Sequence, residues 1–414
     1  MRESDMTLFE WSPLMALKDA APITDARSRD AVLAAALVRA QSAPRWQERF
    51  FREFTAGRFI DAAREEDGAN PDAEVSGLTF PILYRLNYDT PDLRAYAYCV
   101  ARLVSKETAA EHQWTASVLE IAMAPVEGCI DTTVAHWRRA IELEPTNMGY
   151  MAGLLDIHGR VREDVLSWYD VAELTLQLRE MIVQEYGISL EDLDATELDP
   201  SHPLRAIQKT LRQMGAVDQC PERLADLHAR SAPEGDQPIE DLVSEVLEAA
   251  VWANGGSVPD SARRFIRLLL RVHYAEADEL AGSMDVSAVR SLLDAFSYEA
   301  LDIRSYAFWA FRLIKHETAR DHHNASRQIR LSIYKARGAP ETGLFHARRA
   351  MELSPGALEY KRQVLAYYGD VSEQVLSRQE AMQLAREVLV ADPEDRGMRT
   401  LLCRLESADM HDTT

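Results

Sequence analysis

The sequence repeats itself at a constant offset of 210 residues, and this internal duplication limits the folds that the chain can adopt. Between residues 94–170 and 304–380, 26 of 77 positions are identical without a gap. Unrelated sequences would agree at roughly 6% of positions, so the two stretches are copies of one unit. The clearest matching segments are HWRRAIELEP at 136–145 and HARRAMELSP at 346–355. With a shift of five residues the similarity extends upstream, where ERFFREF resembles RRFIRLL.

The spacing of apolar residues predicts helices in both copies. Trp46, Phe50 and Phe54 are four residues apart, which places them on one face of a helix. Helical patterns also occupy 30–41, 78–88, 92–104, 109–123, 132–143, 148–158 and 171–186, with Pro or Gly between most of them and a polar loop at 65–77. No convincing run has the alternation of period two that strands show. The predicted class is all-α, built from duplicated helical-hairpin repeats.

The duplication suggests a division of the chain into five parts. Residues 1–29 are an N-terminal lead-in, and residues 30–187 form the first helical half. Residues 188–239 are an acidic, proline-containing connector with short helices, and residues 240–397 form the second half. Residues 398–414 are a C-terminal cap and tail. A chain of 414 residues is long for one compact core, which agrees with two halves.

Composition excludes several classes of partner. The formal net charge of −21 opposes nucleic-acid binding, which needs Lys and Arg to neutralise phosphate, and docking on an anionic membrane. The sequence contains no run of about 18 apolar residues, so no transmembrane helix is expected. The N-terminus lacks the apolar core of a secretory signal. The four cysteines are scattered without a CxxC pair, as is typical of reduced thiols. We expect a cytoplasmic protein, with a protein or peptide partner, no nucleic acid and no membrane insertion.

The later part of each copy carries a recurring order of small and large residues. In the segment 357–395, Ala381, Ala385 and Val388 precede Pro393 at helical spacing. The same order places Ala350 before Pro355 and Ala140 before Pro145, and aromatic or small residues occur at Tyr360 and Tyr367-Tyr368-Gly369.

In this pattern the chain resembles the tetratricopeptide repeat superfamily over about 70 residues of each half. The resemblance implies an α-solenoid in which the alanines lie on second helices and the aromatic residues on first helices. The spacing of 38 residues from Pro355 to Pro393 exceeds the family's repeat of about 34, which indicates a small insertion.

The resemblance also implies a function. Stacked hairpins form a concave surface, and such surfaces bind extended or helical peptide segments. The function expected is therefore a non-catalytic scaffold or regulator that binds a partner segment, without a cofactor. The motifs GxSxG, GxxxxGK[ST] and HExxH are absent from the sequence. An alternative that rests on family analogy alone is an accessory protein of a glycan- or secretion-assembly system.

The segments ETAAEH and ETARDH, at 107–112 and 317–322, combine residues suited to metal binding or acid–base catalysis. A structural explanation is favoured, because Thr108-x-x-Glu111 has the form of a capping box. Glu107 and His112 would then meet across the first turn of the helix. The residues assigned to capping are Glu107, Thr108, His112, Glu317, Thr318 and His322, with no metal site. His316, His322 and His323 are expected at the surface.

Other polar residues of the two copies are candidates for binding a partner: Arg102, His136, Arg138, Arg139, Arg312, His346, Arg348 and Arg349. One explanation is that Arg138 pairs with Glu142 on a solvated helix face. The alternative is that one arginine of each pair clamps a carboxylate or phosphate of a ligand. Arg102 either pairs with a carboxylate such as Glu107 or faces a cleft. His136 and His346 are expected to be partly buried and hydrogen-bonded.

The remaining alternative is a helical enzyme or small-molecule binder. Its cleft would be lined by Arg102, Glu107, His112 and their counterparts in the second copy. Convergence of Arg102, His112, His136 and Arg139 on one pocket would favour this class. Tyr96 and Tyr306 are expected to be packing residues with hydroxyls at the rim.

Overall fold

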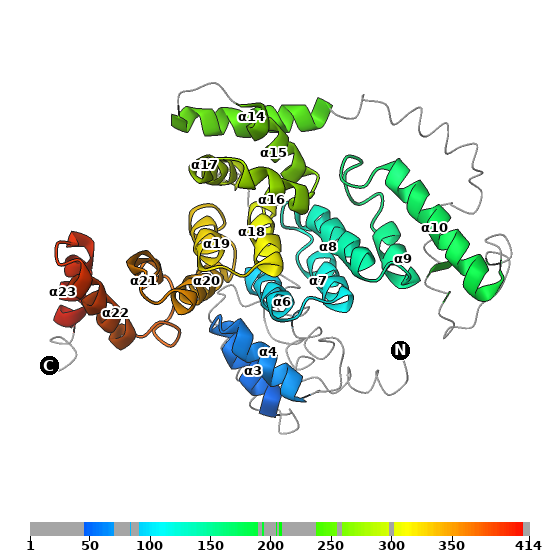
Figure 1. Cartoon of the computed structure of the whole chain (residues 1–414). Helices are drawn as coiled ribbons and strands as arrows, with labels where there is room; N and C mark the ends of the chain where they lie inside the picture. The colour runs from blue at the N-terminus through cyan, green and yellow to red at the C-terminus, as the bar shows by residue number, and fades with distance from the viewer. Residues whose placement is uncertain are drawn as a thin grey trace, which may run out of the picture. The chain divides into compact units, whose positions relative to one another are not determined.

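The computed structural model of the chain describes residues 45–69, 91–188, 237–254, 259–297 and 302–408, together with positions 83, 193, 204, 207 and 208. Throughout these residues the regular secondary structure is α-helical (Figure 1). In this part of the chain, strand-like pairing is confined to two isolated bridges, Asp92 with Arg337 and Tyr368 with Val371. The predicted all-α class is confirmed.

The chain divides into two compact units, and the first contains residues 107–296. Its helices are α7 (Ala109–Ala122), α8 (Cys129–Leu143), α9 (Met148–Asp156), α10 (Trp168–Tyr186), α14 (Gln237–Asn254), α15 (Asp260–Leu270), α16 (Tyr274–Gly282) and α17 (Val286–Ser297). Within this unit α7 packs against α8, α8 against α9, and α9 against α10.

The second unit combines residues 11–106 with residues 297–414. Its helices are α3 (Arg45–Thr55), α4 (Phe59–Ala69), α6 (Leu93–Ser105), α18 (Arg304–Lys315), α19 (Ala319–Ser332), α20 (Ala339–Leu353), α21 (Leu358–Leu365), α22 (Arg378–Ala391) and α23 (Arg396–Ala408). Helix α6 packs against α18, its counterpart in the duplication, and against α20. The boundary between the units therefore falls at Glu107, inside the first copy of the duplicated sequence.

Most predicted helices in the described ranges match observed ones to within three residues at each end. The patterns at 92–104, 109–123, 132–143, 148–158 and 171–186 correspond to α6, α7, α8, α9 and α10. The loop predicted at 65–77 was wrong in its first part, because α4 continues to Ala69. The lead-in, the helices predicted at 30–41 and 78–88 and most of the connector lie outside the described residues.

Turn geometry explains why some glycines are identical in the two copies. Gly128 and Gly338 precede α8 and α20 with φ values of 74° and 73°. Glycine is favoured there because a Cβ atom makes this left-handed conformation costly for other residues.

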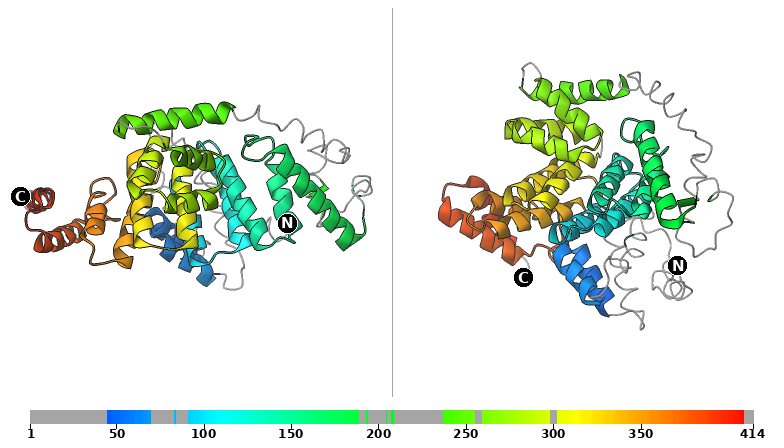
Figure 2. Two further views of the ribbon diagram at one scale, coloured as in Figure 1. Left: turned by 45° about the horizontal axis from the view of Figure 1, so that its top comes forward. Right: turned by 45° about the vertical axis from the view of Figure 1, so that its right-hand side comes forward.

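Helices α20 to α23 of the second unit follow one another as consecutive packed neighbours (Figure 2). Val364, Leu384, Val388 and Leu405 belong to one buried cluster between them. The cluster includes Tyr367, whose hydroxyl donates to the Ser326 carbonyl oxygen at 2.7 Å. Among the described residues, no helix is both long and apolar enough to cross a membrane.

Replacing Gly343 by alanine should destabilise the second unit. A Cβ atom at this position would overlap the buried Tyr367 hydroxyl. Overpacking of a filled core costs about 1–3 kcal/mol, which exceeds the gain in helix propensity of about 1 kcal/mol. Gly282→Ala is the matched control, because a Cβ atom there meets nothing within 4 Å. Urea unfolding should show a lower midpoint for Gly343→Ala and an equal or higher one for Gly282→Ala.

Candidate functional site

The two copies of the ET-x-x-x-H segment begin helices in the same way. The Thr108 side chain accepts a hydrogen bond from the Glu111 amide at 3.1 Å and caps α7. The Thr318 side chain accepts one from the Asp321 amide at 3.0 Å and caps α19. Each N-cap satisfies an amide at a helix start that has no partner within the helix.

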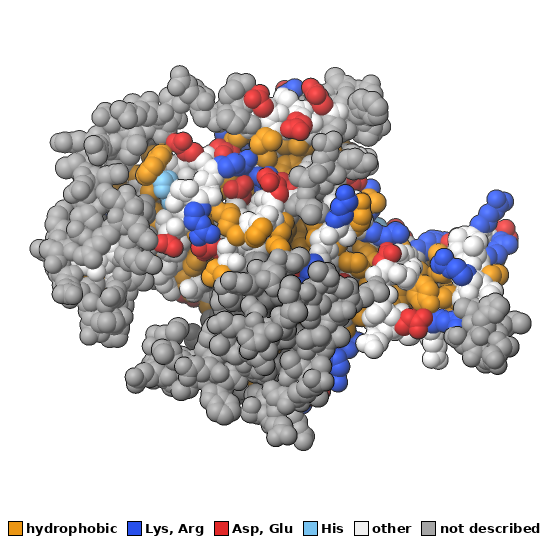
Figure 3. All heavy atoms as spheres, turned by 180° about the vertical axis from the view of Figure 1, so that it is seen from behind, with side chains coloured by type: hydrophobic (Ala, Val, Ile, Leu, Met, Phe, Trp, Pro, Cys, Tyr) orange, Lys and Arg blue, Asp and Glu red, His pale blue; other side chains and the backbone are white. Residues whose placement is uncertain are grey.

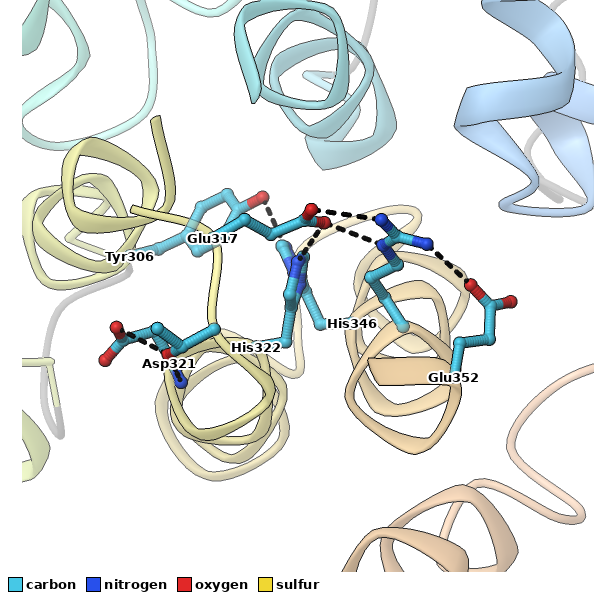
Figure 4. Close-up of polar contacts among 8 residues, drawn as sticks. Tyr306, Glu317, Asp321, His322, His346 and Glu352 are labelled. Atoms are coloured by element: carbon cyan, nitrogen blue, oxygen red, sulfur yellow. Dashed lines mark hydrogen bonds and ion pairs between the residues drawn. The ribbon is translucent and has the colours of Figure 1, made fainter. Parts of the chain in front are cut away.

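The second copy then holds a chain of polar contacts (Figure 4). The Tyr306 hydroxyl lies 2.9 Å from Nε2 of His346, whose Nδ1 lies 2.8 Å from Nδ1 of His322. Nε2 of His322 lies 3.1 Å from Oε1 of Glu317. Arg349 donates from Nε and Nη2 to the two carboxylate oxygens of Glu317, at 2.7 and 3.0 Å. We call these five residues the second histidine network.

Burial and charge set the protonation states in this network. The hydrogen bonds from His322 and Arg349 lower the pKa of Glu317 to about 2, so the carboxylate is ionised. Burial lowers the pKa of His322, and burial together with the neighbouring His322 holds the pKa of His346 well below its usual range. Burial also raises the pKa of Tyr306, so its hydroxyl keeps its proton.

These states permit one arrangement of protons. An ionised carboxylate only accepts, so His322 donates from Nε2 to Glu317 and, being neutral, accepts at Nδ1. His346 must then donate from Nδ1 and accept at Nε2, where the Tyr306 hydroxyl donates. Every contact in the chain thus has one donor and one acceptor. We assign the tautomers from this network, since hydrogen positions follow from the pattern of bonds.

The first copy repeats the contacts among the two histidines, the glutamate and the arginine, and we call His112, His136, Glu107 and Arg139 the first histidine network. Nδ1 of His112 lies 2.8 Å from Nδ1 of His136, and Nε2 of His112 lies 3.2 Å from Oε1 of Glu107. Arg139 donates to both oxygens of Glu107, at 2.7 and 3.2 Å. The pKa of Glu107 is lowered to about 2 by the hydrogen bond from His112 and by Arg139.

Burial corrects two expectations about these residues. His322 was predicted at the surface, but it is 2% exposed because it points inward from α19 toward His346. The Tyr306 hydroxyl was predicted at a rim, but the residue is fully buried and the hydroxyl bonds to His346. His136 is fully buried as well. In both networks the imidazoles are therefore engaged inside the protein and present no nucleophile or base to solvent.

The adjacent arginines differ in role. Arg138 donates from Nη2 to the Val165 carbonyl oxygen at 2.7 Å, and Arg348 makes the same contact with Val375 at 2.7 Å. Arg138 does not form the suggested pair with Glu142. That glutamate instead pairs with Arg139 at 2.9 Å, three residues away, because Arg138 is turned toward the loop before α10. The equivalent pair of Arg349 with Glu352 is 3.0 Å long.

Arg102 and Arg312 lie outside the networks. Arg102 donates to Asp67 at 2.9 Å and approaches Glu66 at 3.4 Å, so its carboxylate partners come from α4 and not from Glu107. Arg312 donates from Nε to Asp321 at 3.1 Å. The enzyme alternative required Arg102, His112, His136 and Arg139 to converge on one pocket. His112, His136 and Arg139 lie together in the first histidine network, but Arg102 does not join them.

A cleft of about 460 Å³ opens in the second unit beside Arg348 and Arg349. Three segments line it: the start of α4, the outer face of α20, and the loop that leads into α22. Phe59 and Phe345 form its apolar part, with ring centroids 5.0 Å apart. The identities between the copies do not indicate this cleft, because Phe345 corresponds to an alanine in the first copy.

One face of the molecule carries charged side chains of both signs. Figure 3 shows Lys and Arg side chains interspersed with Asp and Glu side chains on one face. Among the described residues, no group of three or more His, Cys, Asp or Glu side chains is placed to hold a metal ion.

Comparison with known proteins adds no assignment. No protein-family model matches the chain, and no curated protein matches its sequence. The similarity to tetratricopeptide repeats therefore rests on the residues quoted above.

Proposed function

We propose that this protein is a non-catalytic interaction scaffold with tetratricopeptide-like repeats, and that it binds a segment of a partner protein. The observation that carries the proposal is the cleft of the second unit, lined by Arg348 and Arg349. Its volume of about 460 Å³ falls within the range of clefts that bind ligands. Its apolar part and charged rim resemble the core and rim of protein interfaces.

The packing of α20 to α23 gives further support. Each of these helices packs on the next one in sequence, as the helices of tandem hairpin repeats do. Catalysis has less support, because the histidines are buried and their hydrogen bonds are directed at other residues of the networks. The arginines of the cleft are already paired with carboxylates, so a partner would gain most from the apolar part of the cleft.

Site-specific photocrosslinking of the intact chain in its native cells tests this proposal. A benzophenone amino acid is placed at Ile60, which lines the cleft, and separately at Val390, which is 83% exposed in the same unit. We expect one defined polypeptide to crosslink from position 60 and not from position 390. The same products at both positions, or none at position 60, would contradict the assignment of this cleft.

A further inference from the structure

A second, larger cleft lies in the first unit, along α9 and near the C-terminal ends of α8 and α10. Its volume is about 880 Å³. The apolar part of its lining consists of Trp137, Met148, Ala152, Tyr186, Leu204 and Ile207. Gly153 allows the Trp137 ring to lie directly against α9, because a Cβ atom would overlap the ring. A cleft of this volume can hold several side chains of a bound segment.

Three carboxylates stand at the edge of this cleft: Glu144, Asp156 and Glu185. All three residues are exposed. None of them forms an ion pair with another residue in the described part of the chain, although Glu144 accepts a hydrogen bond from Asn147 and Glu185 accepts one from the Tyr186 hydroxyl. The described lining residues include no Lys or Arg. The arginines of the second unit's cleft, by contrast, are paired with carboxylates.

Helix ends add to this negative potential. Glu144 is the C-cap of α8, and Glu185 and Tyr186 are the last residues of α10. The C-terminal end of a helix carries a partial negative charge, which basic residues in the last turn commonly offset. Neither α8 nor α10 has a basic residue in its last turn. The cleft runs along most of the length of α9, so the dipole of α9 favours neither positive nor negative charge in the cleft.

The second copy has different residues at the positions that form this cleft. Gly153 corresponds to Gln363, whose side chain donates to Ser326 at 3.1 Å, and Trp137 corresponds to Ala347. Ala152 corresponds to Arg362, which pairs with Asp395 at 2.8 Å. The residues of the first unit's cleft therefore diverged after the duplication, whereas those of the histidine networks were retained.

We propose that the first unit's cleft binds a basic amphipathic segment of a partner protein, with apolar side chains in the cleft and Lys or Arg side chains at the three carboxylates. This assignment rests on the proposed function and specifies the partner's chemistry. A basic segment would find both unpaired carboxylates and helix C-termini at the edge, and an apolar surface between them. An acidic segment would meet only like charges among the described lining residues.

Binding of model peptides to the intact chain tests the assignment. The probe is a fluorescently labelled helical peptide of Leu and Lys with one apolar face, measured by anisotropy at about 0.15 M salt. A Leu/Glu peptide of the same pattern and a Leu/Lys peptide of scrambled pattern are the controls. The test variant carries Glu144→Gln, Asp156→Asn and Glu185→Gln together. The control variant carries Glu245→Gln, Glu248→Gln and Glu359→Gln, which remove the same charge at exposed positions outside the cleft.

We expect the amphipathic Leu/Lys peptide to bind and the two control peptides to bind more weakly. The test variant should lose roughly tenfold in affinity and the control variant less than about twofold, since three local charge pairs are removed in one case only. Tyr186→Ser should weaken binding through the apolar part. Equal losses in the two triple variants would mean attraction by net charge and would overturn the assignment, as would equal binding of the scrambled peptide. If a partner crosslinks at Ile60 while the peptide results fail, only the first unit's assignment is lost.

Discussion

Lowering the pH from 7 to 5 should destabilise the protein because the histidine networks hold neutral imidazoles. Burial keeps the pKa values of His136 and His346 well below the usual value of 6.5. Below pH 6.5 the unfolded chain therefore binds protons that the folded chain does not. The stabilisation is complete above pH 6.5 and is lost as the pH falls toward the folded-state pKa values. Each such histidine lowers the free energy of unfolding by about 1.4 kcal/mol per pH unit, and the two together by about 2.7 kcal/mol.

Urea unfolding followed by circular dichroism at pH 7, 6 and 5 measures this slope. The variant with His136→Asn and His346→Asn keeps an N–H donor near the Nδ1 position but does not titrate in this range. It should be less stable at pH 7 and show a much shallower slope. His316→Asn changes an exposed histidine and should leave the slope unaltered. A double variant with the slope of the unmodified protein would show that these imidazoles are not neutral in the folded state.

The glutamates of the networks act in a lower pH range. Their pKa values of about 2 lie below the usual 4.5, so the folded state favours the ionised carboxylates of Glu107 and Glu317. Their stabilisation is complete above pH 4.5 and is lost as the pH falls from 4.5 to about 2. A loss of stability between pH 7 and 5 therefore comes from the histidines and not from these carboxylates.

Replacing Asp92 by alanine should cost about 3–5 kcal/mol of unfolding free energy. Asp92 is fully buried, and its Oδ2 lies 2.6 Å from Arg94 and 3.2 Å from Arg337. Burial alone would raise the pKa of Asp92, but the two guanidinium groups hold it below its usual value. Its Oδ1 also caps α6 by accepting from the Arg94 amide at 3.0 Å. The substitution thus removes the counter-charge of two largely buried arginines together with a helix cap.

Two matched variants make the test specific. Asp92→Asn keeps an acceptor for the cap but not the charge, so its loss should be intermediate. Asp61→Ala removes an exposed carboxylate paired with Arg64, and such surface pairs contribute about 0–1 kcal/mol. The midpoint of urea unfolding should fall most for Asp92→Ala, less for Asp92→Asn and least for Asp61→Ala. A change below about 1 kcal/mol for Asp92→Ala would mean that the buried cluster adds little to stability.

Local sequence patterns were sufficient to predict the described helices of the first copy. Apolar spacing placed α6 to α10, and Thr108 and Thr318 marked the starts of α7 and α19, because these features depend on residues within a few positions of each other. The unit that α6 joins could not be predicted in this way. Helix α6 packs against α18 through residues that are 210 positions apart in the sequence, and local patterns cannot predict such contacts.

The candidate site was predicted in part. Identity between the copies drew attention to Glu107, His112, His136 and Arg139, which do converge in the first histidine network. The identical spacing of 24 residues between the two histidines in each copy could have suggested their pairing. The burial of His112 and His322 could not be inferred, because it depends on how the helices pack. The identities between the copies do not indicate the first unit's cleft, because its lining residues differ between the copies.

The unit boundary at Glu107 has a consequence for how the chain is made. Helix α6 leaves the ribosome 210 residues before its counterpart α18, with which it shares the buried Tyr96–Tyr306 contact. At ordinary rates of synthesis that interval is on the order of 10–40 s. During this time the face of α6 that will pack on α18 and α20 has no native partner. The second unit can close only after α18 and α20 have been synthesised, so the nascent chain passes through a stage at which chaperone binding would protect it from aggregation.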